Sequence, residues 1–168
     1  MSLSMYQASV TVFVRTLTAL STILDKAAAD AEARGVDPAV LVNARLAPDM
    51  FPVSRQVQIA ADTARNAAAN LAGVTPPSHP DTETTFPELK ARIATVIDYI
   101  QAFKPEQFEG AETRTVVMKM RTGDLSFAGA DYLLGFALPN LYFHSATTYD
   151  ILRHNGVALG KRDFLGAI

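Results

Sequence analysis

Apolar residues recur three or four positions apart along four long stretches of the chain, the spacing of the buried face of an amphipathic helix. These stretches cover residues 6–34, 52–72, 85–103 and 129–154. Polar residues fill the remaining positions of each stretch. The pattern predicts four main helices packed around a shared apolar core.

Local signals define several helix ends. Gly35 follows the first stretch and suits a left-handed helix stop. Asp37 and Pro38 form an N-cap followed by proline at the first helical position, which predicts a short connecting helix over about 38–45. Thr85 and Glu88 have the spacing of a capping box.

The segment 74–82 is predicted to be a loop, because its prolines cannot donate backbone hydrogen bonds. In residues 116–127 the apolar period changes from helical to alternating, around the turn residues 122–124. That alternation predicts a β-hairpin before the last long helix. We expect residues 1–168 to form a single domain, ending in an ordered or partly ordered tail.

Composition and charge exclude several classes of function. The 168 residues carry a net charge of -2, which gives no field strong enough to favour nucleic acid or anionic lipid. We therefore expect no nucleic-acid partner and no membrane contact, and no apolar run approaches the roughly 18 residues of a membrane span. The chain has no cysteine, so any metal must be bound by His, Asp, Glu, Asn or Gln. The lack of cysteine and of a signal sequence favours the cytoplasm.

The three histidines differ in their predicted surroundings. His79 lies in the proline-rich loop, where a solvated side chain is the simpler interpretation, and His154 lies in the last turn of the last helix, where it can interact with free carbonyls. His144 lies inside that helix among apolar residues. Asn140 is one turn before it and Thr148 one turn after, so this ridge gathers polar groups that are costly to bury unpaired.

Pro139 is expected to disturb the last helix next to Asn140. A proline inside a helix removes one hydrogen bond and crowds the carbonyl four residues earlier, which here belongs to Gly135. The pair predicts a kink or a loosened turn. A bend that only wraps the helix around the core is the alternative.

Two polar residues of the second helix are further candidates. Gln56 lies on a ridge with apolar neighbours, which indicates a buried hydrogen bond. Asp62 shares a polar ridge with Gln58 and Arg65, and an Asp–Arg pair or a solvated face is the preferred interpretation.

Known catalytic and metal-binding motifs are absent from the sequence. A helical pair of metal-binding histidines needs imidazoles about one turn apart, whereas residue 148 is threonine. His144 and His154 would be roughly 15 Å apart along a continuous helix. The sequence also lacks a GxSxG elbow, a phosphate-binding glycine loop, a dinucleotide fingerprint and an HExxH helix.

Four segments of the sequence stand out as possible family signatures: 46–52 (LAPDMFP), 136–144 (FALPNLYFH), 151–156 (ILRHNG) and 159–166 (LGKRDFLG). They resemble an uncharacterised bacterial family, a domain of unknown function grouped with the DinB/YfiT-like superfamily. The resemblance implies an all-α, DinB/YfiT-like four-helix bundle with a short β-hairpin before the last long helix. It also implies a central pocket and, in many members, a homodimer.

Many members of that superfamily hold a divalent metal with three histidines, one from the second helix and two, four residues apart, from the last. Only His144 can be carried over here, because Thr148 takes the second position and residues 52–71 contain no histidine. The resemblance therefore implies a degenerate site. It would bind Zn or Ni through His144 with Gln56, Asp62 or Asn140, or it would bind no metal.

Three functional hypotheses follow. The preferred one is a small-molecule-binding bundle whose ligand contacts His144, Asn140, Gln56 and Asp62. A second treats the same groups as a buried polar network that only fixes helix register. The alternative is a metal-dependent transferase or hydrolase of the DinB/YfiT type, with His144 as ligand or general base and Asn140 orienting the substrate.

Overall fold

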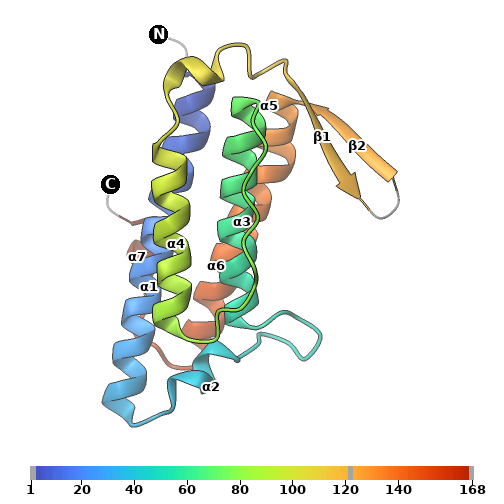
Figure 1. Ribbon diagram of the computed structural model, residues 1–168. Coiled ribbons are helices and arrows are strands. Elements are labelled where there is room, and N and C mark those ends of the chain that lie inside the picture. Colours follow the sequence, from blue (N-terminus) through green and yellow to red (C-terminus); the bar gives the residue numbers. More distant parts are fainter. Residues whose placement is uncertain (1–2, 121–122, 167–168) are drawn as a thin grey trace.

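Four long helices lie side by side in the computed structural model, which describes residues 3–120 and 123–166 (Figure 1). They are α1 (Val12–Arg34), α3 (Val53–Ala72), α4 (Phe86–Gln101) and α6 (Leu138–His154), and the predicted bundle is thereby confirmed. The shorter helical elements are η1 (Gln7–Thr11), α2 (Pro38–Val42), η2 (Pro105–Phe108), α5 (Gly129–Tyr132), η3 (Leu133–Ala137) and α7 (Lys161–Leu165).

The predicted local signals take the expected form. Gly35 ends α1 in the left-handed conformation, with φ of 63°. The Asp37 side chain accepts a hydrogen bond from the Ala39 N–H at the start of α2, and Thr85 and Glu88 form both bonds of the capping box that opens α4. The connecting helix is shorter than predicted, since α2 ends at Val42. The 3₁₀ turn η2 was not predicted, because four residues are too few to show a period.

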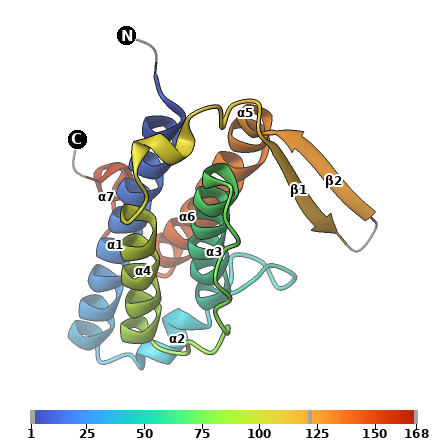
Figure 2. The same cartoon turned by 45° about the horizontal axis from the view of Figure 1, so that its top comes forward.

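The hairpin extends away from one end of the bundle (Figures 1 and 2). Strands β1 (Thr115–Met120) and β2 (Gly123–Ala128) pair antiparallel, with Val116 opposite Phe127 and Met118 opposite Leu125. Part of the predicted turn, residues 121 and 122, lies outside the described residues. The hairpin leads directly into α5, so it places β1 beside the start of the last helical stretch.

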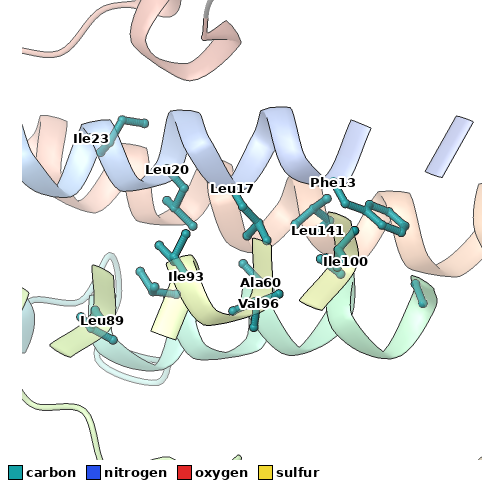
Figure 3. Close-up of a cluster of buried hydrophobic side chains, with 14 of the residues drawn as sticks. Phe13, Leu17, Leu20, Ile23, Ala60, Leu89, Ile93, Val96, Ile100 and Leu141 are labelled. Atoms are coloured by element: carbon teal, nitrogen blue, oxygen red, sulfur yellow. The ribbon is translucent and has the colours of Figure 1, made fainter. Parts of the chain in front are cut away.

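The core lies where the inner faces of the four helices meet (Figure 3). Phe13 and Leu17 from α1 meet Ile93 and Val96 from α4, and each is at most 1% exposed. On α3 half of the buried residues are alanine, for example Ala60, and small side chains let neighbouring helices approach closely. Side chains this deeply buried supply the main stabilisation of the bundle, at about 25 cal/mol per Å² of apolar surface removed from water.

One segment, Gln7–Arg34, is long and apolar enough to cross a membrane by length and composition alone, contrary to the sequence-based expectation. Half of its most apolar window is buried inside the bundle. Core helices of globular proteins pass the same test, and the packing of α1 against α4 and α6 is that of a core helix.

Helices α3 and α4 run in the same direction, so the chain must return along the bundle between them (Figure 1). The connection, which we call the strap, is the irregular segment 73–85 and includes the predicted loop. Arg92 of α4 holds the strap in place. The Arg92 side chain is 1% exposed, and its guanidinium lies 2.9 Å from Asp81 and 3.0 Å from Glu83 of the strap. It also donates to the Pro80 carbonyl at 3.0 Å.

The last helical stretch contains the predicted irregularity. Residues Leu133–Ala137 form a π-helical turn, in which the Leu138 N–H bonds back five residues to the Leu133 carbonyl. Pro139 follows in the first turn of α6. The loosened turn predicted from Gly135 and Pro139 is confirmed. A π turn takes more residues per turn than an α turn, so side chains four apart line up more nearly along the axis.

Candidate functional site

His144 and Gln56 meet between α6 and α3. His144 Nδ1 lies 2.6 Å from Gln56 Oε1, and Gln56 is 1% exposed. The other end of the Gln56 amide, Nε2, donates to the Phe51 carbonyl at 3.1 Å. The buried hydrogen bond predicted for Gln56 is confirmed, and its partner is the histidine that the sequence singled out independently.

The neighbours of His144 on α6 bond to their own helix. Thr148 Oγ1 donates to the His144 carbonyl at 2.9 Å, and Asn140 Nδ2 donates to the Phe136 carbonyl at 2.8 Å. Thr148 is fully buried, whereas Asn140 is half-buried. Among the described residues, Asn140 Oδ1 has no hydrogen-bond partner, and Asn140 lines a groove.

Asp62 belongs to a different cluster. Its Oδ1 lies 2.7 Å from Arg65, as the predicted Asp–Arg pair requires, and also 2.7 Å from the buried Arg92. Asp62 lines the groove, but its carboxylate is neutralised by two guanidinium groups. The structure thus brings His144 together with Gln56 and leaves Asp62 out of that pair.

A groove of about 430 Å³ lies between α3, β1 and the α5–η3–α6 stretch. Its uncharged polar lining consists of the amides Asn66, Asn70 and Asn140 with Thr63 and Tyr132, and its charged lining of Arg55, Asp62 and Lys119. Asn70 Nδ2 donates to the Tyr132 hydroxyl at 3.3 Å, and Asn66 Oδ1 accepts from Arg65 at 3.2 and 3.3 Å. Among the described residues, Asn66 Nδ2 and the Oδ1 atoms of Asn70 and Asn140 have no partner, so they are left to face a ligand or water.

The apolar lining comes from Ile59, Phe136, Val117 and Met118. Phe136 stacks on Tyr132 with ring centroids 5.9 Å apart and an interplanar angle of 18°. Burial raises the pKa of Tyr132, and the weaker effect of the Asn70 hydrogen bond opposes it, so the phenol stays protonated at neutral pH and can donate. Polar and apolar groups thus share the lining about equally, and small-molecule sites combine apolar walls with convergent polar groups.

The sequence did not single out Thr63, Asn66 and Asn70 on α3, or Tyr132 on α5. A signal was present, because residues 63, 66 and 70 recur at helical spacing in an otherwise alanine-rich helix. Without the hairpin and α5 placed opposite, that stripe is indistinguishable from a solvated helix face.

His144 lies just beyond the groove, one helical turn past Asn140. Arg55 connects the two regions, since it lines the groove and its charge acts on His144. Burial, followed by the positive charge of Arg55, lowers the pKa of His144 from its ordinary value of 6.5. The imidazole is therefore neutral at pH 7.

This lowered pKa predicts a loss of stability in acid. The unfolded chain takes up the His144 proton near pH 6.5, and the folded protein does so only at lower pH. The free energy of unfolding should therefore decrease as the pH falls from 6.5 through the folded pKa, and this contribution should be constant at higher pH. Urea denaturation between about pH 8 and about pH 5 measures it. His144→Gln should have a shallower pH dependence, and equal slopes in the two proteins would contradict a buried neutral imidazole.

The residues present do not fit the three-histidine metal site that many members of the resembled superfamily have. Nowhere in residues 3–120 and 123–166 do three His, Asp or Glu side chains gather closely enough to hold an ion. His144 Nδ1 is bonded to Gln56, and the Thr148 hydroxyl is directed to a backbone carbonyl. A neutral amide and a back-bonded hydroxyl are poor replacements for two imidazoles.

Comparisons with known proteins agree with this architecture. The family model described as "Domain of unknown function (DUF1993)" matches residues 5–165. The crystal structure of a DinB family member protein from Shewanella denitrificans superposes with a TM-score of 0.91 at 45% sequence identity. The alignment covers 97% of this chain and 92% of that one. No curated protein matches. The chain therefore belongs to the DUF1993 family, with the DinB-like fold of helical bundle and hairpin.

Proposed function

We propose that the protein binds a small polar molecule in the groove between α3, β1 and the α5–η3–α6 stretch, and that it does so without a metal. The observation that carries this proposal is the set of three amides, Asn66, Asn70 and Asn140, that face one groove with unused hydrogen-bonding capacity. In a protein core or at a contact between helices, the donors and acceptors of such amides would have hydrogen-bond partners in the protein.

The lining favours a ligand that has an apolar or planar face and several hydrogen-bonding atoms. Phe136 offers a half-buried ring for stacking, while amide and hydroxyl groups on the opposite wall offer both donors and acceptors. Two of the charged groups at the groove are committed, because Asp62 is paired with Arg65 and Arg92, and Arg55 is paired with Asp81. Lys119 of β1 also lines the groove. A neutral or anionic polar molecule suits this balance.

A tryptophan reporter tests the groove directly. The chain has no tryptophan, so Phe136→Trp places a single indole in the groove, and Val40→Trp places one on the exposed surface of α2 as a control. Titration with a defined library of nucleosides, sugars, amino acids and aromatic amides should shift the emission of Phe136→Trp only. Combining it with Asn66→Leu and Asn140→Leu should abolish the response. A library that moves both reporters equally, or neither, contradicts the proposal.

The metal-dependent transferase or hydrolase using His144 is the competing function, and one measurement separates the two. Protein purified without a metal-affinity step and then incubated with Zn or Ni should carry no stoichiometric metal by elemental analysis. One metal per chain that is lost in His144→Ala would contradict the metal-free proposal and favour the competing function.

We further propose that the protein acts in the cytoplasm as a homodimer. The absence of cysteine suits a reducing compartment. Large apolar side chains that are more than half exposed, such as Leu134 on η3, are available for contact with a second copy.

A further inference from the structure

The amide of Gln56 has only one orientation that satisfies both of its contacts. Its Nε2 must face the Phe51 carbonyl, because a carbonyl can only accept a hydrogen bond, and the distance is 3.1 Å. Its Oε1 must then face His144 Nδ1 at 2.6 Å, and an amide oxygen also only accepts. His144 Nδ1 therefore carries the proton, and Nε2 carries the lone pair.

The lone pair of Nε2 is available to a ligand. Among the described residues, Nε2 has no hydrogen-bond partner, and it is not one of the buried polar atoms that lack one. It therefore reaches the molecular surface. The acceptor nitrogen, Nε2, is accessible, whereas the donor nitrogen, Nδ1, is bonded to Gln56 of α3.

Two residues that contact the His144–Gln56 pair, Phe143 and Phe51, have exposed phenyl rings. The Phe143 ring meets the imidazole edge to face, with centroids 5.2 Å apart, and is 56% exposed. Phe51, whose carbonyl orients Gln56, is 53% exposed and lies under the Arg55 guanidinium at 6.0 Å. The exposed Phe143 ring beside the oriented imidazole therefore offers apolar contact to a ligand that bonds His144.

We infer that Gln56 is a positioning residue that holds His144 as the Nδ1–H tautomer, so that Nε2 accepts a hydrogen bond from the hydroxyl or N–H group of an aromatic or apolar ligand. This inference extends the proposed function, since such a ligand would reach from Arg55 at the end of the groove toward His144. The site selects for a donor, because a ligand that offers only acceptors would face the lone pair of Nε2.

Nitrogen NMR of the histidine rings tests the tautomer without any ligand. In ¹⁵N-labelled protein at neutral pH, His144 should show a protonated, pyrrole-type Nδ1 and an unprotonated, pyridine-type Nε2, while His79 and His154 serve as internal references. Gln56→Leu should shift His144 toward the Nε2–H form that free imidazole side chains prefer. Gln56→Glu, which keeps an acceptor at this position, should keep Nδ1 protonated, either as the Nδ1–H tautomer or as the imidazolium that a carboxylate favours. An Nε2–H tautomer in the unmodified protein overturns the inference.

Phenol and anisole form a matched pair of probes for the acceptor. Both have one aromatic ring, but only phenol has an O–H to donate. Phenol should move the His144 Nε2 resonance and bind about tenfold more tightly than anisole, the effect of one good hydrogen bond. The preference should be lost in Gln56→Leu. Equal binding of the two probes, or no response at His144, overturns the inference. The proposed function is tested separately, by the Phe136→Trp reporter in the groove.

Discussion

Arg92→Leu is expected to lower the free energy of unfolding by about 3 kcal/mol, the cost of removing one partner from a buried ionic cluster. The guanidinium side chain is 1% exposed and lies within 3.0 Å of Asp62, Asp81 and Glu83. Leucine would leave Asp62 with Arg65 and Asp81 with Arg55, and Glu83 would lose its pair with Arg92. The expected loss in the free energy of unfolding lies at the low end of the range for buried pairs, because the carboxylates are partly in contact with water.

Chemical denaturation measures this loss, and two substitutions serve as controls. Lys90→Ala removes the exposed pair with Asp25 and should change stability by less than about 1 kcal/mol. Arg92→Lys keeps the charge but not the planar fork, so its effect should fall between the two. Limited proteolysis should also cut the strap faster in Arg92→Leu, because the side chain that fixes residues 80–83 is gone. Unchanged stability together with an unchanged cleavage rate would show that Arg92 does not hold the strap.

Gly129→Ala is expected to cost about 3 kcal/mol, the upper part of the range for overpacking a close-packed site. A Cβ atom at this position would lie 1.9 Å from the Ala111 carbonyl oxygen and 3.2 Å from Leu71 Cδ2. The obstacle is backbone, so no side-chain rotation relieves it. Gly129 begins α5 directly after β2, and the displacement would move the hairpin relative to α3.

Gly135→Ala is the matched control for this substitution. Gly135 lies only six residues further along the same stretch, in η3, and an added Cβ would meet nothing within 4 Å. Alanine there should be neutral or stabilising by about 0.5 to 1 kcal/mol, since it reduces the entropy of the unfolded chain. Thermal or urea unfolding of both variants gives the comparison. Similar stabilities for the two would contradict the close contact at Gly129.

Local features of the fold could be predicted from the sequence because their causes are local. The Asp37 cap, the Thr85–Glu88 capping box and the Pro139 disturbance each depend on residues within five positions of one another. The strap could be predicted only as a loop. Its fixed course depends on Arg92, whose carboxylate partners come from α3 as well as from the strap itself.

The candidate site could be predicted only in part. Gln56 and His144 each stood out as a polar residue on an apolar ridge, but they are 88 positions apart and their contact depends on how α3 packs against α6. Asn66, Asn70 and Tyr132 gave weaker signals, because a groove between two elements and a hairpin exists only after those elements are assembled. Asp62 was correctly paired with Arg65, whereas its second partner, Arg92, could not be deduced from helical spacing.

The parallel course of α3 and α4 restricts how the length of this protein can vary in evolution. A helix of 20 residues is about 30 Å long, and an extended chain covers at most about 3.3 to 3.6 Å per residue. A return path of fewer than about nine residues could not reach the start of α4. Insertions between Ala72 and Phe86 can be accommodated at the surface, whereas deletions of more than a few residues would force α4 to reverse its direction. Relatives that differ in length between α3 and α4 should therefore almost always have a longer strap than this protein.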